Sequence, residues 1–154
     1  MKSIDIAVMV KNSSRYLDSF WNVIKSFSYP KDKIRVFFIY GSSSDSTLEK
    51  LKKIARDKDI AVEVYREPGD PDLKKYGQFM GASIWYDFKD LCEGDYLLTM
   101  DVHIEKAPRD LIEKLVSYNE DVIAPYPYIA GKNLFYDSWT VSYTHLTLPT
   151  ICSV

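Results

Sequence analysis

The chain has 154 residues, of which 46% are hydrophobic and 27% charged, and its formal net charge is −2. This length predicts one globular domain with its own core, and the balanced charge argues against a nucleic-acid-binding protein. No apolar run approaches the roughly 20 residues that a membrane-spanning helix needs, and the first residues do not resemble a signal peptide, so a cytoplasmic protein is expected. The widely separated Cys92 and Cys152 predict neither a disulfide framework nor a zinc site.

Apolar runs and helical periodicity alternate along the first part of the chain. Ile4–Val10 is a nearly continuous apolar run, which predicts a strand buried on both faces, and Ile34–Tyr40 predicts a second strand of the same kind. The segment between them predicts a helix capped by Ser13 or Ser14. Its apolar face comprises Leu17, Phe20, Trp21, Ile24 and Phe27.

The same alternation continues to residue 125. Residues 46–49 have the spacing of a capping box and predict a second helix, with an apolar side formed by Leu48, Leu51 and Ala55. Further helices are expected over 74–91 and from Pro108 to Tyr118, the latter with Leu111, Ile112, Leu115 and Val116 facing inward. The remaining apolar runs predict strands over 60–65, 96–100 and 121–125.

This order of elements predicts an α/β fold with a mostly parallel sheet and helices on both faces. The crossovers between parallel strands should be right-handed. In such sheets ligands bind beyond the carboxyl ends of the strands. The segments to inspect for function are therefore the strand ends at 11–12, 41–45, 66–67 and 101–103.

Asp101 and His103 are the strongest candidate site residues. They follow an apolar strand, and residues two apart share one side of an extended chain, so both side chains can reach one divalent cation. A carboxylate with an imidazole suits manganese or another first-row metal better than calcium. The alternative is structural: Asp101 caps the following turn and His103 is hydrogen-bonded in a loop.

Polar residues at the other strand ends are candidates for binding a nucleotide. The loop 41–45 precedes a helix, and main-chain N–H groups at a helix N-terminus attract anions. The alternatives are a serine-rich cap and solvated surface side chains. The sequence contains neither a G-x-G-x-x-G dinucleotide motif nor a P-loop motif. The candidate nucleotide-sugar-binding residues are Lys11, Asn12, Gly41, Ser42, Ser43, Asp45, Arg66 and Asp101.

Together these motifs resemble the nucleotide-sugar-binding half of GT-A glycosyltransferases. V-M-V-K-N at 8–12 is similar to the opening of that superfamily, and Y-G-S-S-S-D-S-T at 40–47 is similar to the D-G-S-x-D-x-T loop of family 2 enzymes. D-V-H at 101–103 stands where these enzymes carry their D-x-D motif. Residues 121–125 and 134–139 resemble the collagen galactosyltransferase and fungal mannan-polymerase branches.

The resemblance implies transfer of a sugar from a nucleoside-diphosphate sugar to an unknown glycan, protein or lipid acceptor. It implies Mn²⁺ or Mg²⁺ as cofactor, with Asp101 contacting ribose and metal and His103 binding metal, as in the D-x-H variant of polypeptide N-acetylgalactosaminyltransferases. The acidic residue that often reads uracil is replaced by Tyr40 or Gly41, so the base is left open. The acceptor side and the catalytic base of such enzymes come from later sequence, so this fragment is expected to be inactive.

Two other functions remain open at this stage. The chain could be another nucleotide-binding enzyme, such as a sugar-phosphate nucleotidyltransferase, although the G-x-G-[ST]-R-x-x-P loop of those enzymes is absent. It could also be a non-catalytic domain that binds a nucleotide or a carbohydrate.

The end of the chain differs in composition from the rest. No Lys, Arg, Asp or Glu lies within 141–154. Residues 141–150 resemble the conceptual translation of a transposase-type sequencing adapter, a contaminant of metagenomic assemblies. The resemblance implies a C-terminally incomplete domain over 1–140 and a non-native tail over 141–154. The alternative is an uncharged edge strand.

Overall fold

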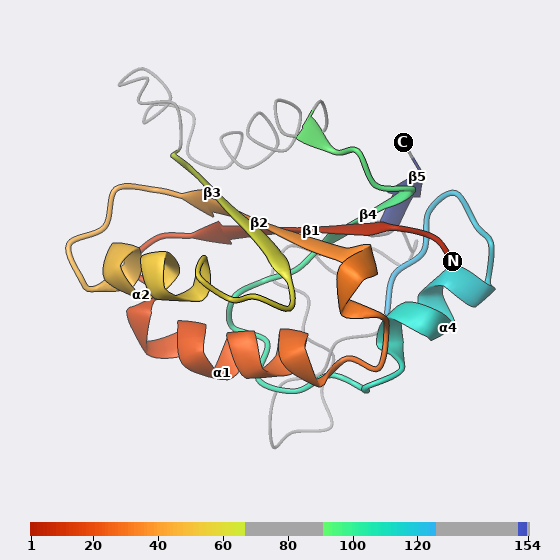
Figure 1. Ribbon diagram of the computed structural model, residues 1–154, viewed down its shortest axis with the longest axis horizontal. Coiled ribbons are helices and arrows are strands. Elements are labelled where there is room, and N and C mark those ends of the chain that lie inside the picture. The colour runs from red at the N-terminus through yellow and green to blue at the C-terminus, as the bar shows by residue number, and fades with distance from the viewer. Residues whose placement is uncertain (67–90, 126–150, 154) are drawn as a thin grey trace, which may run out of the picture.

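A computed structural model describes residues 1–66, 91–125 and 151–153, and these form an α/β fold around one sheet. The strands lie in the order β3-β2-β1-β4-β5 (Figure 1). The first four in the chain, which pair in parallel, are β1 (Ile4–Val10), β2 (Ile34–Tyr40), β3 (Ala61–Arg66) and β4 (Tyr96–Thr99). The predicted mostly parallel sheet is confirmed.

The described helices cover one face of this sheet (Figure 1). They are α1 (Ser14–Ser26), α2 (Thr47–Ile54) and α4 (Leu111–Ser117), and a 3₁₀ turn, η1 (Lys31–Lys33), precedes β2. Of the helix expected over 74–91, all but the last residue lies outside the described residues, so the predicted helices on the other face stay a prediction.

The core lies between the sheet and these helices. The rings of Phe20 on α1 and Phe38 on β2 pack edge to face, with centroids 6.3 Å apart. Phe37 and Ile39, on the opposite side of β2, are also buried, as expected of a central parallel strand. The predicted apolar face of α1 is confirmed, because all of its members are buried: Leu17, Phe20, Trp21, Ile24 and Phe27.

Four details of the predicted elements were wrong. Helix α4 begins at Leu111, three residues after Pro108, and α2 buries Ile54 while Ala55 is exposed. Ser46 is the N-cap of α2 but makes no side-chain capping bond, so the predicted capping box does not form. Residues 121–125 contain no strand and are mostly exposed, with Val122 40% accessible. The other neighbour of β4 is instead β5 (Ile151–Ser153), which pairs antiparallel to it.

The strand β5 lies within the uncharged tail. Its position at the edge of the sheet matches the edge strand that the sequence offered as an alternative. Main-chain pairing depends little on side-chain identity, so an extended segment of any origin can add to a sheet edge in this way. The non-native origin of 141–154 therefore stays a prediction.

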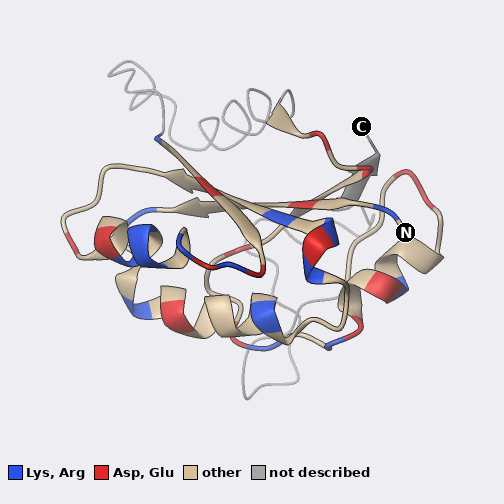
Figure 2. Ribbon diagram, viewed as in Figure 1, with Lys and Arg blue, Asp and Glu red and all other residues tan. Residues whose placement is uncertain are grey.

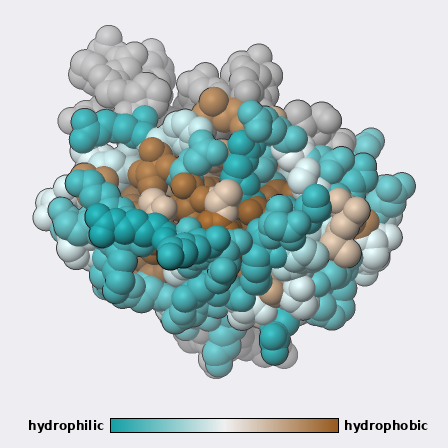
Figure 3. All heavy atoms as spheres, in the orientation of Figure 1, coloured by the Kyte–Doolittle hydropathy of each residue, from teal (hydrophilic) through white to brown (hydrophobic). Residues whose placement is uncertain are grey.

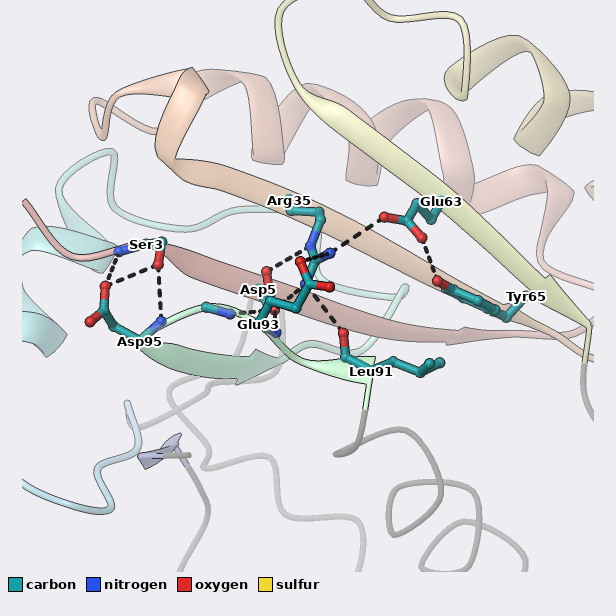
Figure 4. A network of polar contacts seen from close by, with 9 residues as sticks. Ser3, Asp5, Arg35, Glu63, Tyr65, Leu91, Glu93 and Asp95 are labelled. Carbon is teal, nitrogen blue, oxygen red and sulfur yellow. Dashed lines mark hydrogen bonds and ion pairs between the residues drawn. The ribbon is translucent and has the colours of Figure 1, made fainter.

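A polar cluster fastens the start of β4 to β1 and β2 (Figure 4). The buried Asp5 carboxylate accepts hydrogen bonds from Arg35 Nε at 3.0 Å and Nη2 at 2.7 Å, and from the main-chain N–H groups of Glu93 and Gly94 at 2.8 and 2.9 Å. Burial by itself raises the pKa of Asp5, but the hydrogen bonds from Arg35, Gly94 and Glu93 outweigh it and the pKa lies below its ordinary value. We refer to Asp5, Arg35, Glu93 and Gly94 as the amino-edge clamp.

Lys and Arg residues alternate with Asp and Glu residues along the described elements in the view of Figure 2. Apolar side chains are visible on the face shown in Figure 3, between the sheet edge and the helices. Leu48, Val62 and Val64 are half-buried apolar residues that pack against the core. Among the residues that the structure describes, no helix has the length and apolar character needed to cross a membrane.

Candidate functional site

The strand order places a topological switch point between β1 and β4. The chain moves outward from β1 to β2 and β3, and then returns to place β4 on the other side of β1. All four strands run in the same direction, so their carboxyl ends lie along one edge of the sheet. Crevices at such a switch point are the common ligand sites of open α/β sheets. Lys11 and Asn12 follow β1 at this edge, and Asp101 and His103 follow β4.

Asp101 and His103 are in direct contact at this edge. The Asp101 Oδ1 atom lies 2.5 Å from His103 Nδ1 and also accepts a hydrogen bond from the His103 main-chain N–H at 2.8 Å. Val102, between them, is buried, so the two polar side chains share the outer side of the chain. Their side chains are 54% and 56% exposed. The two side chains lie side by side through a turn after Thr99 and not along an extended strand, and their predicted role as cation ligands stays a prediction.

The same contacts are those of the structural alternative, in which Asp101 caps a turn. Among the described residues, however, Asp101 Oδ2 and His103 Nε2 make no hydrogen bond. A carboxylate and an imidazole, both open to solvent, form a donor set that suits a first-row divalent cation. The described part of the chain holds no cluster of three or more His, Cys, Asp or Glu residues that could hold a metal ion.

Tyr16, on the first turn of α1, packs against the imidazole. The two ring centroids are 4.3 Å apart and the planes meet at 74°, an edge-to-face arrangement. The Arg15 guanidinium lies over the Tyr16 ring, 4.5 Å from its centroid. The start of α1 therefore contacts the residues that follow β4.

Asp45 joins the starts of the two helices that follow β1 and β2. Its Oδ2 accepts a hydrogen bond from the Ser14 main-chain N–H, and its Oδ1 accepts one from the Thr47 N–H, both at 3.0 Å. The hydroxyl of Thr47 also donates to Asp45, and these bonds, led by that hydroxyl, hold the pKa of Asp45 well below its ordinary value. A carboxylate thus already occupies the position where a helix N-terminus attracts an anion.

Asn12 makes a second connection between the segment that follows β1 and the loop 41–45 that follows β2. Its side-chain Oδ1 accepts a hydrogen bond from the Ser44 N–H at 2.8 Å, and its main-chain N–H donates to Ser43 Oγ at 3.0 Å. Asn12 has a φ of 49°, in the left-handed region that asparagine tolerates better than most residues. This backbone conformation turns the chain sharply after β1.

The other predicted nucleotide-binding residues are distributed along the same edge. Gly41 is buried and donates its N–H to the Val10 carbonyl, which continues the pairing of β2 with β1. Lys11 and Ser42 are exposed. Arg66 ends β3, two strands from β1, and within the described residues it makes no hydrogen bond or ion pair with the other candidates.

Sequence reasoning missed Tyr16, and it named Ser14 only as a helix cap and Thr47 only within the 40–47 motif, not as site residues. Tyr16 lies outside the apolar face of α1, and no motif links it to a histidine 87 positions later. Thr47 is buried, and its hydroxyl accepts a hydrogen bond from the Ser13 N–H at 2.8 Å. For Thr47, the available sequence signal was its position two residues after Asp45.

No family model matches the sequence, and no curated protein matches it significantly. Solved structures do match. S. aureus TarS 1-349 has a TM-score of 0.64 at 18% identity, over 86% of this chain and 38% of that one. A mannosyltransferase from Pyrobaculum calidifontis, in complex with GDP-Man and Mn²⁺, has a TM-score of 0.60 at 17% identity, over 78% of this chain and 33% of that one.

A third solved structure is glucosyl-3-phosphoglycerate synthase from Mycobacterium tuberculosis, in complex with Mn²⁺, UDP and phosphoglyceric acid. It has a TM-score of 0.50 at 16% identity, over 75% of this chain and 38% of that one. The chain therefore spans 33–38% of the length of these three structures. At this identity the likeness establishes the fold, which is the GT-A fold that these structures share.

Proposed function

We propose that this chain is the donor-binding part of a glycosyltransferase that takes a sugar from a nucleoside-diphosphate sugar with the help of a divalent cation. The observation that carries the proposal is the contact between Asp101 and His103 at the switch point of a GT-A fold, with both side chains open to solvent. Two of the matched solved structures are complexes with Mn²⁺, which supports the same proposal.

In this proposal Asp101 and His103 hold Mn²⁺ or Mg²⁺. When bound, the cation would neutralise negative charge on the diphosphate leaving group. Two protein donors leave coordination positions open for phosphate oxygens. The contact between Asp101 Oδ1 and His103 Nδ1 keeps the two side chains adjacent in the folded chain, and a cation held by both would take the place of that contact.

The remaining candidate residues take two roles. Lys11, Asn12, Ser42 and Arg66 border the edge where the nucleotide would bind, and their side chains or main-chain groups can contact it. Asp45 instead holds the loop, because both of its carboxylate oxygens already accept main-chain hydrogen bonds. Gly41 and Ser43 shape the same loop through hydrogen bonds to Val10 and Asn12.

By the resemblance, Tyr40 or Gly41 stands where many family 2 enzymes read the nucleotide base of the donor. Tyr40 is buried, and its hydroxyl accepts a hydrogen bond from the Ser43 N–H at 3.2 Å. Gly41 offers no side chain. No carboxylate therefore stands at the position that reads uracil in many family 2 enzymes, and both uridine and guanosine donors have to be tested.

Binding is the appropriate experiment, because the chain covers only part of the solved enzymes and we propose that transfer and acceptor recognition need the remainder. Isothermal titration calorimetry would measure UDP-GlcNAc and GDP-mannose binding to the full chain, with and without Mn²⁺. We expect Mn²⁺-dependent binding of at least one donor. We expect it to weaken about tenfold or more in Asp101→Asn and His103→Gln, the loss typical of a disturbed metal site.

Asp59→Asn is the matched control, since Asp59 is an exposed carboxylate in the turn before β3. Donor binding that is absent from the wild type, or that survives both site substitutions unchanged, would contradict the proposal. The non-catalytic alternative would gain support from sugar or nucleotide binding that is independent of the cation.

A further inference from the structure

We propose that Tyr16 is a positioning residue for His103, which fixes the plane of the imidazole so that the ring is presented to a cation in one orientation. The inference rests on the proposed function, because it concerns how this chain prepares its cation site. It adds a residue from α1, in a different part of the sequence from the D-V-H motif.

Two contacts hold the His103 ring from different sides. Asp101 Oδ1 lies 2.5 Å from Nδ1, and the Tyr16 ring meets the imidazole edge to face, with centroids 4.3 Å apart and planes at 74°. The imidazole turns about its Cα–Cβ and Cβ–Cγ bonds, and the contact with Asp101 holds it at one ring atom only. The aromatic contact restricts this rotation, since edge-to-face geometry is directional.

The need for such a contact follows from exposure. The His103 side chain is 56% accessible, so surrounding core residues do not confine it. An exposed side chain loses rotamer freedom when it binds a cation, and this loss opposes binding. A ring already held by Asp101 and Tyr16 has lost part of that freedom in the folded chain.

Tyr16 can serve this role because it is itself fixed. Its main-chain N–H donates to the Ser13 carbonyl at 2.9 Å, and Ser13 in turn donates to Thr47 Oγ1 at 2.8 Å. The Asp45 carboxylate holds the neighbouring Ser14 N–H, and the Arg15 guanidinium covers the Tyr16 ring. The contact therefore links the loop 41–47 to His103.

Mn²⁺ binding to the full chain, followed by the electron paramagnetic resonance signal of the free ion, tests this role. We expect Tyr16→Leu to weaken Mn²⁺ binding about 3- to 10-fold, which corresponds to the energy of one aromatic pair. Tyr16→Phe keeps the ring and should bind as the wild type does. Tyr118→Leu, which removes a 65% exposed tyrosine beyond α4, should also have no effect.

A second measurement needs no cation. In the nuclear magnetic resonance spectrum of the metal-free chain, the ring protons of His103 should show contacts to the Tyr16 ring, and their shifts should move in Tyr16→Leu but stay in Tyr16→Phe. Circular dichroism on each variant establishes that the fold is retained.

The outcomes separate this inference from the proposed function. A wild type that binds no Mn²⁺ overturns both. A wild type that binds Mn²⁺, with equal affinity in Tyr16→Leu or with unchanged His103 shifts in that variant, overturns the role of Tyr16 alone. Weakened binding in Tyr16→Phe would also overturn it, because the phenol hydroxyl and not the ring would then be responsible.

Discussion

Asp5 at the amino end of the sheet and Asp101 at its carboxyl end differ in both burial and hydrogen bonding. At the amino end Asp5 is 2% exposed and accepts four hydrogen bonds, two of them from one guanidinium. At the carboxyl end Asp101 is more than half exposed, and one of its oxygens has no hydrogen-bond partner among the described residues. A hollow of about 260 Å³ lies beside Asp5 and is lined in part by Arg35, Glu93 and Gly94, but the carboxylate there is already saturated. Unused bonding capacity, and not a hollow alone, distinguishes the candidate site.

Asp45 shows that exposure alone would not make this distinction. It lies at the carboxyl edge and is exposed, as Asp101 is, yet both of its oxygens accept main-chain hydrogen bonds. Asp45 therefore resembles Asp5, because both oxygens of each carboxylate accept hydrogen bonds from the chain itself. The comparison therefore predicts that Asp5 and Asp45 stabilise the fold, whereas Asp101 and His103 serve a ligand.

Removal of Asp5 is expected to have the largest effect on stability. Asp5→Ala leaves the Arg35 guanidinium, whose side chain is 20% exposed, without its bidentate partner, and leaves the N–H groups of Glu93 and Gly94 without an acceptor. Breaking a buried ion pair from one side costs about 3 kcal/mol or more. Urea denaturation followed by circular dichroism would measure the loss in the free energy of unfolding.

The control for Asp5 uses the same arginine. Glu93→Gln removes a carboxylate that is 83% exposed and pairs with Arg35 at 3.1 Å. Such a surface pair contributes about 1 kcal/mol or less. Equal losses in the free energy of unfolding in Asp5→Ala and Glu93→Gln would show that burial does not determine how much each carboxylate stabilises the fold.

Gly94→Ala is expected to have the next largest effect. A Cβ atom at this position would lie 3.0 Å from Asp5 Cγ and 3.1 Å from the Asp5 main-chain N. The neighbouring strand must then shift, and such overpacking costs about 1–3 kcal/mol. The same denaturation experiment measures it, and combining Gly94→Ala with Asp5→Ala should cost less than the sum of the two, because the nearest clash disappears. A strictly additive pair would contradict this reading of the clamp.

The effect of Asp45 should appear as a dependence of stability on pH. Its hydrogen bonds, first that from the Thr47 hydroxyl, lower its pKa in the folded state below the unfolded value. A lowered pKa means that the carboxylate stabilises the fold fully above the unfolded pKa, near about 4, and that this contribution is lost as the pH falls below it. Melting temperatures measured between about pH 6 and 2.5 should fall less steeply in Asp45→Asn than in the wild type. Asp59→Asn should follow the wild-type curve, and identical curves for all three proteins would refute the assignment.

Much of this fold could be predicted because the strands and α1 are specified by local patterns. The apolar runs gave β1 and β2 at their observed bounds, and β3 and β4 to within one residue at each end. Residues 121–125 show the limit of this reasoning, since a short apolar run is also compatible with an irregular segment whose one inward side chain, Ile123, packs on the core. Which strand neighbours β4 depends on contacts from elsewhere in the chain.

The candidate site could be predicted only where its residues are close in sequence. Asp101 and His103 converge through their own turn, so their spacing was informative. The caps of α1 and α2 were assigned to the serines at their starts, but Asp45 satisfies N–H groups of both helices, one of them 31 positions away. A charged acceptor makes stronger hydrogen bonds than a hydroxyl, and only the folded chain brings it to Ser14. Tyr16 and His103 meet for the same reason, without a local signal.

His103→Ala is expected to have the smallest effect on stability. It tests most directly the difference between the structural residues at the amino end of the sheet and the candidate ligand-binding residues at the carboxyl end. The imidazole is more than half exposed, and among the described residues its ring contacts Asp101 and Tyr16, both accessible to solvent in part. Its removal buries no unpaired group and opens no cavity, so the free energy of unfolding should change by no more than about 0.5 kcal/mol, as for most surface substitutions. Mn²⁺ binding should be lost in the same variant, because one of two protein donors is gone. A large loss of stability with Mn²⁺ binding intact would show that His103, like Asp5, is a structural residue. Unchanged stability with Mn²⁺ binding lost would establish that His103 serves a ligand at the carboxyl edge of the sheet.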